Sequence, residues 1–169
     1  MNPDDLAAIA ALMRGQRQAA LGTLRGGAPY VSMVAYAAEP DLSGLLLHLS
    51  RLAPHTQHLL ADPRAALLIC EPDDGRDDVQ TLARLTLVGT ATPIAADSPA
   101  YHAARERYLA RLPAAAPLFA FPDFVLFRFE PHAARYVGGF ARALTLTADD
   151  LRAAAQQPLN HKDTKGTKP

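Results

Sequence analysis

A two-glycine turn between two apolar stretches constrains the fold of this chain most. The segment QAALGTLRGGAPYVSMVAYAAE, residues 18–39, is divided by Gly26-Gly27. Glycine pairs are typical of the tight turns that connect antiparallel strands. Parallel strands need long crossover connections, so an early hairpin excludes an all-parallel sheet. We therefore predict a sheet that is at least partly antiparallel.

The other segments have the patterns of short strands with a few helices between them. Apolar runs bounded by turn residues are typical of strands. The strands predicted beyond the hairpin are 44–50, 64–71, 81–94 and 124–139. Capping residues and apolar periodicity predict helices. These helices are 2–13, 97–112 and 147–156, with Asn2, Asp97 or Ser98, and Thr147 as their caps.

This order of elements predicts a mainly β protein with peripheral helices, an α+β fold. An antiparallel barrel fits better than a doubly wound α/β sheet. We predict one domain over residues 1–157 and a polar, flexible tail over 158–169. Gly89 inside a strand predicts a bulge or a close backbone approach. The proline-rich segment 113–123 is expected to be a link without regular structure.

Charge and composition narrow the possible partners. The 17 Lys and Arg residues balance the 17 Asp and Glu residues, so the formal net charge is zero. Nucleic acids and anionic membranes favour basic surfaces, and we expect neither as a partner. A single cysteine excludes an internal disulfide and fits a reducing compartment. Without a basic leader or a membrane-length apolar run, the expected location is cytoplasmic.

The segment LHLSRLAPHTQHLLADPRAALLIC, residues 47–70, gathers groups that bind anions at a strand-to-helix junction. Ser50 and Arg51 follow an apolar strand, and His55 and Thr56 open the next helix. If Ser50 caps that helix, the remaining N–H groups stay available. If the helix begins at Pro54, its cap is Ala53, a poor one. Both alternatives place an under-capped helix end beside a guanidinium, which suits a phosphate, although an ordinary helix start is the simpler interpretation.

Other chemical motifs in the sequence are weaker. His55 and His58 could face one metal ion, but no Asp or Cys has the spacing that would complete a known ligand set, so we predict no metal site. Cys70 ends an apolar run and is expected to be buried. Gly138-Gly139 does not have the dinucleotide-binding spacing, and no nucleophile-elbow motif occurs.

Four segments, in this order, resemble a known family. They are ALGTLRGGAPYVSMVAYA, LHLSRLAPHTQHLLADPRAALLIC, TLARLTLVGTATPI and DFVLFRFEPHAARYVGGFARA. Together they are similar to the FMN-binding split β-barrel proteins related to pyridoxamine 5'-phosphate oxidase. The segments SRLAPHTQHL, RLTLVGTA and ARYVGGFARA resemble the haem-utilisation branch of that group, the HugZ-like proteins. The resemblance covers residues 6–143.

The resemblance implies a homodimer with FMN bound at the subunit interface. It implies that Ser50 and Arg51 hold the flavin phosphate, with His55 and Thr56 as the HugZ-like pair beside them. It also implies that a polar strand side chain, Arg84, faces the flavin. The strand whose backbone would run along the flavin ring consists of Tyr30, Val31, Ser32, Met33 and Val34.

This sequence also departs from the true oxidases. Leu52 stands where they carry a second basic residue, the segment MVAYA lacks their strand cation, and Arg142 is not followed by their histidine. These differences argue against pyridoxal phosphate synthesis. The first hypothesis is therefore an FMN-dependent oxidoreductase with an unknown small-molecule substrate and unknown catalytic residues.

Two alternatives stay open from the sequence. The first is a haem-binding or haem-degrading protein, with His161, His132 or His102 as the candidate iron ligand. The second is a non-catalytic flavin-binding module. Identifying the bound ligand, FMN or haem, would separate the haem hypothesis from the two flavin hypotheses.

Overall fold

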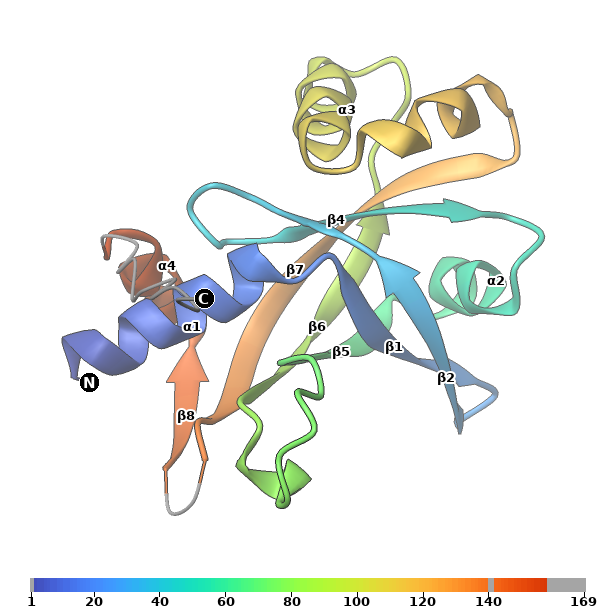
Figure 1. Ribbon diagram of the computed structural model, residues 1–169. Helices are drawn as coiled ribbons and strands as arrows, with labels where there is room; N and C mark the ends of the chain where they lie inside the picture. The colour runs from blue at the N-terminus through green and yellow to red at the C-terminus, as the bar shows by residue number, and fades with distance from the viewer. Residues whose placement is uncertain (1, 140–141, 158–169) are drawn as a thin grey trace, which may run out of the picture.

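The computed structural model describes residues 2–139 and 142–157, and it contains one antiparallel sheet that curls into a half-barrel (Figure 1). The strands follow the order β2-β1-β5-β6-β7-β4-β3, and β8 pairs with β7. Their bounds are β1 Gln18–Arg25, β2 Ala28–Ala35, β3 Ala37–Ala38, β4 Leu45–Ser50, β5 Arg64–Cys70, β6 Arg84–Pro93, β7 Phe124–Val137 and β8 Ala143–Thr147. Because β2 and β3, at the two ends of this path, do not pair with each other, the barrel is open, and the predicted antiparallel split barrel is confirmed.

The predicted hairpin joins β1 to β2. Gly26 and Gly27 have φ angles of 55° and 84°, in the left-handed region that glycine adopts without steric cost. Two such residues form the turn whose twist matches that of the flanking strands. The register runs from Gln18 opposite Ala35 to Arg25 opposite Ala28, without a bulge.

Helices surround the sheet. They are α1 Pro3–Gly15, α2 Pro54–Ala61, α3 Pro99–Arg111 and α4 Ala148–Ala155. Asn2, Ser98 and Thr147 cap three of them through side-chain oxygens, as predicted. In Figure 1, α1 and α4 lie side by side, α3 lies across β4 and β7, and α2 lies near β1 and β2. None of the helices in the described part of the chain has the length and apolarity needed to cross a membrane.

Three sequence predictions about elements were wrong in detail. Segment 113–123 is not an irregular link, because Pro113–Ala120 forms the 3₁₀ helix η2. The strand predicted from residue 81 begins at Arg84, since Val79–Thr81 forms the short 3₁₀ helix η1. The strand β8 was missed, because its segment ALTLT is short and continues directly into α4.

The core has two parts, one on each side of β4 and β7. The larger part fills the curl of the sheet, where Phe127 and Phe129 pack with Ile9 of α1 and Leu151 of α4. A smaller cluster contains Leu46, Leu126 and Tyr108 and lies under α3 and η2. Leu126 and Phe129 are fully buried on opposite faces of β7, because helices cover both sides of this strand.

Gly89 confirms the predicted irregularity in β6. The register with β7 shifts between Val88 and Gly89, which is a β-bulge. A side chain at Gly89 would collide with the backbone carbonyl of Glu130, so the strands approach too closely for any other residue.

One face of the sheet carries apolar side chains that are exposed to solvent. Val31 is 67% exposed, Met33 68% and Val88 53%, and Leu68 lies between them on β5. We call these four residues the open sheet face. Cys70 lies on the same side of β5 and is exposed, so its predicted burial was wrong. β5 carries apolar residues on both of its faces, so its sequence does not show the alternation between buried and exposed positions.

A polar corner at the start of helix α2

Helix α2 begins without a side-chain cap. Its N-cap residue is Ala53, which makes no capping hydrogen bond, and Pro54 occupies the first turn. The second of the two sequence alternatives is therefore the correct one. Pro54 has no N–H, and the N–H groups of Thr56 and Gln57 donate to the Ala53 carbonyl, so the His55 N–H and the positive end of the helix dipole are what this end offers a ligand. This end lies directly after Ser50 and Arg51, where β4 finishes.

The first turn of α2 is tied to β2 through one side-chain contact. The hydroxyl of Ser32 lies 3.0 Å from His55 Nδ1. Burial, and then the nearby His58, lower the pKa of His55 below its ordinary value, so this imidazole is neutral at pH 7. With Nδ1 engaged by Ser32, His55 keeps Nε2 as its other polar atom.

His58 belongs to a separate set of contacts on the same helix. Its Nδ1 lies 3.0 Å from the hydroxyl of Thr23, and its ring meets Tyr30 edge to face with centroids 5.1 Å apart. His55 and His58 therefore have different partners rather than a shared one. Within residues 2–139 and 142–157, no group of three or more His, Cys, Asp or Glu side chains could hold a metal ion.

Ser50 and Arg51 are held by a residue from a distant part of the chain. The Ser50 hydroxyl donates to Asp123 Oδ2 at 2.7 Å and accepts from the Leu52 N–H at 3.1 Å. The Arg51 N–H donates to the Asp123 carbonyl at 2.7 Å. In the described part of the chain, the exposed Arg51 side chain forms no ion pair. We call Ser32, Ser50, Arg51, His55 and Asp123 the α2 corner.

The other predicted site residues do not lie at one place. Thr56 adjoins the corner, but its hydroxyl is buried and has no hydrogen-bond partner among the described residues. Tyr30 and Ser32 lie on the α2 side of β2, Val34 is buried, and Val31 and Met33 belong to the open sheet face.

Arg84 lies apart from the α2 corner within one chain. It pairs in register with Cys70 and Val137, whereas Arg64, which follows α2, pairs with Thr90 at the other end of β6. Its guanidinium donates to the carbonyls of Gln80 at 2.9 Å and Leu82 at 3.3 Å. The structure therefore brings Ser32, Ser50, Arg51 and His55 together and leaves Arg84 at a distance.

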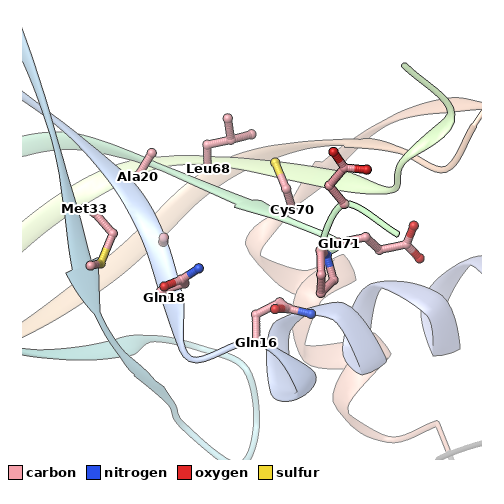
Figure 2. Close-up of a pocket in the computed structure, with 10 residues that line it drawn as sticks. Gln16, Gln18, Ala20, Met33, Leu68, Cys70 and Glu71 are labelled. Carbon is pink, nitrogen blue, oxygen red and sulfur yellow. The ribbon is translucent and has the colours of Figure 1, made fainter. Parts of the chain in front are cut away.

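The open sheet face continues into pockets. Figure 2 shows Met33, Ala20, Leu68 and Cys70, from three neighbouring strands, around a pocket of about 350 Å³ that is edged by Gln16, Gln18 and Glu71. A second pocket of about 290 Å³ lies between Leu24, Val31, Ala66 and Val88, with Tyr30 and Arg64 also lining it. Exposed apolar side chains gathered on one face are a feature of binding and assembly surfaces.

Sequence reasoning missed Asp123 as a member of the corner. It lies in the turn FPDF after η2, and 73 residues separate it from Ser50. Neither residue type nor spacing indicates such a contact. Only the register that places Ser50 opposite Phe124 brings this turn to the end of β4.

The curled antiparallel sheet is that of a split-barrel protein, and the comparison with known families agrees. Residues 6–138 match the family model described as pyridoxamine 5'-phosphate oxidase. The chain therefore belongs to this family. Within it, the chain lies close to the HugZ branch.

Relatives of known sequence and structure include haem proteins. The chloroplastic haem oxygenase HOZ of Arabidopsis thaliana is 38% identical over 138 residues, which are 79% of this chain and 40% of that protein. The haem oxygenase HutZ of Vibrio cholerae is 26% identical over 129 residues, 74% of this chain and 70% of that protein. A haem-binding protein from Mycobacterium smegmatis superposes with a TM-score of 0.77 and 29% identity, covering 88% of this chain and 60% of that one.

Proposed function

We propose that this chain binds haem and takes part in haem degradation. The observation that carries the proposal is the similarity to HOZ, which is 38% identical over 79% of this chain. The chain spans 40% of the length of that relative, so we propose the activity of the relative for this chain and do not assign it. The geometry of the open sheet face supports the same ligand.

Haem requires an apolar surface, a cation near its propionates and an iron ligand. The open sheet face offers Val31, Met33 and Val88, all more than half exposed. Arg51 offers a cation without an ion pair in the described part of the chain. β2 is an edge strand that carries Val31 on one side and Ser32, a member of the α2 corner, on the other. These residues fit an amphipathic ligand placed along this edge.

The three candidate iron ligands lie in different parts of the chain. His132 lies beside the β6 bulge, and its Nε2 is 3.4 Å from the hydroxyl of Thr90, two positions from Val88 of the open sheet face. His102 lies on α3, which covers β4 and β7 rather than the strands of the open sheet face. His161 is outside the described residues. Among the described histidines, His132 is therefore our candidate. Bound haem would supply the redox chemistry, and these residues would bind and orient it.

A haemin titration tests this proposal. We expect a shifted Soret band that saturates at one haemin per chain or per pair of chains. His132→Ala should alter the position of that band, and His102→Ala is the matched control. Adding ascorbate under air should then bleach the band if the haem is degraded. An unshifted spectrum with the full chain would contradict haem binding, and a stable band would contradict degradation alone.

A flavin is the second candidate ligand, because the uncapped start of α2 beside Arg51 is the kind of site that binds a phosphate. The chain would then be an FMN-dependent oxidoreductase or a non-catalytic flavin-binding module. Bound FMN would give absorbance near 450 nm and would raise the melting temperature, because it binds the native state alone. A colourless protein whose melting temperature FMN does not change would contradict this candidate.

We also propose that the chain forms a homodimer through the open sheet face. A second copy would cover Val31, Met33, Leu68 and Val88 and would enclose a ligand bound there. Light scattering should give the mass of two chains, and Met33→Glu should give the mass of one. The exposed change Val79→Glu, on η1, is the control. A monomeric wild-type chain would contradict the dimer.

A further inference from the structure

The α2 corner contains a carboxylate where a phosphate site would be expected to carry cations. The Ser50 hydroxyl, which the family resemblance assigns to the phosphate, already donates to Asp123 Oδ2 at 2.7 Å. The same hydroxyl accepts from the Leu52 N–H at 3.1 Å. The Ser50 hydroxyl thus has one partner as a donor and one as an acceptor. To donate to a ligand, it would have to break its hydrogen bond to Asp123.

The formal charges of the corner sum to about zero. Arg51 contributes one positive charge and Asp123 one negative charge, while Ser32 and Ser50 are neutral. Neither Arg51 nor Asp123 forms an ion pair among residues 2–139 and 142–157. Leu52, 81% exposed, adds no charge at the position after Arg51. A flavin phosphate is largely dianionic at neutral pH, so this donor set offsets only part of its charge.

We infer that Asp123 sets the anion selectivity of the α2 corner, so that it accepts a carboxylate such as a haem propionate and disfavours the phosphate of FMN. A carboxylate carries one charge, which Arg51 and the helix end match. A dianion placed near Asp123 meets repulsion that grows with its charge. The carboxylate part of this inference rests on the proposed haem binding, whereas the phosphate part stands without it.

FMN and riboflavin form the sharpest pair of probes, because they differ only in the phosphate. We would measure both dissociation constants by flavin fluorescence for the full chain and for Asp123→Asn. The amide still offers an oxygen to Ser50, so the corner should keep its shape. The wild-type chain should bind FMN no more than about threefold tighter than riboflavin. Asp123→Asn should raise that preference at least about fivefold, because one repulsive charge is removed.

Two control variants keep this result interpretable. Asp97→Asn removes one exposed surface carboxylate from the loop before α3 and should leave the FMN preference unchanged. If Asp123→Asn lowers the melting temperature markedly, Asp123→Ser replaces it, because it also removes the charge while retaining an acceptor for Ser50. The expected rise in FMN preference is the same for both Asp123 variants.

Haemin and its dimethyl ester test the carboxylate part. The wild-type chain should bind haemin at least about fivefold tighter than the ester, and Arg51→Ala should abolish that difference. The inference is overturned if wild-type protein prefers FMN over riboflavin tenfold or more, or if removing the Asp123 charge leaves that preference unchanged. It is also overturned if neither flavin binds to any variant, or if haemin and its ester bind equally well. Failure of haemin to bind at all would instead contradict the proposed function, while the flavin ratios would still decide the role of Asp123.

Discussion

His48, on β4, and His55, on α2, flank the same strand-to-helix connection but differ in the groups that surround them. His48 is 7% exposed, and its ring stacks on Phe119 with centroids 3.7 Å apart and planes 5° apart. Tyr108 and Phe124 complete this set, which we call the His48 cluster. His55 is half-buried and contacts a hydroxyl on β2. One histidine is enclosed by aromatic rings, and the other contacts a hydroxyl at the uncapped start of α2.

The difference shows what separates a structural histidine from one available to a ligand. Burial lowers the pKa of His48 to about 4, and its Nδ1 has no partner in the described structure. An aromatic ring of similar shape could replace it there. His55 retains a polar neighbour and an uncapped helix end, which a ligand can use. We therefore expect changes at His48 to alter stability and changes at the α2 corner to alter binding.

The largest expected effect is on stability at His48. His48→Ala should lower the free energy of unfolding by about 3 kcal/mol, because it removes a buried ring from between Phe119 and Tyr108. His48→Phe should stay within about 1 kcal/mol of wild type, since the ring remains and an unpaired buried nitrogen is lost. Urea unfolding measures both. Equal stability of His48→Ala and wild type would show that the cluster does not hold α3 and η2 in place.

The second effect is a loss of stability in acid. The folded-state pKa of His48 is about 4 against an ordinary value of 6.5, so only the unfolded chain takes up this proton between those pH values. Stability should be complete above pH 6.5 and should fall by roughly 3 kcal/mol as the pH drops to 4. His55, whose pKa is also lowered, adds to the loss in the same direction. His48→Phe should remove most of this pH dependence in urea unfolding curves at pH 4 to 7, and an unchanged curve would contradict the assignment.

The third effect is on binding at the α2 corner. Arg51→Ala should weaken haemin binding about fivefold, since a charge-assisted contact to the ligand is lost. Its free energy of unfolding should change by less than about 0.5 kcal/mol, because the side chain is exposed. Arg25→Ala, at the exposed end of β1, is the matched control. If the two variants bind haemin equally, Arg51 has no part in the site.

The smallest effect concerns Ser32. Ser32→Ala removes the 3.0 Å contact to His55 and should cost about 0.5–1 kcal/mol of stability. It should also raise the pH at which His55 titrates, because the freed ring is more accessible to water. NMR titration of the His55 ring protons measures this shift. A titration identical to that of wild type would mean that Ser32 does not orient His55.

The sequence predicted the elements that local chemistry determines. Gly26-Gly27 can only be a turn with left-handed φ angles, and Asn2, Ser98 and Thr147 cap the helices that follow them. The uncapped start of α2 was one of two local alternatives, because both Ser50 and Ala53 could precede the helix. These features depend on neighbours within one turn of chain.

The features that the sequence did not predict depend on distant contacts. Asp123 reaches Ser50 only through the pairing of β4 with β7. Cys70 is exposed because the outer side of β5 faces solvent although its residues are apolar. For the same reason Arg84 is separated from the other predicted site residues. It pairs with Cys70 at one end of β6, whereas Arg64, which follows α2, pairs with Thr90 toward the other end. Such facts follow from register, which no local pattern determines.

Hydrogen–deuterium exchange with and without haemin tests the central claim most directly. We predict that haemin protects residues 29–35 of β2 and 51–58 of the α2 corner. Residues 101–120 of α3 and η2, which cover the His48 cluster, should exchange at the same rate in both samples. Protection of 101–120 without protection of 51–58 would place the ligand at α3 and η2 and would contradict the assignment of the α2 corner.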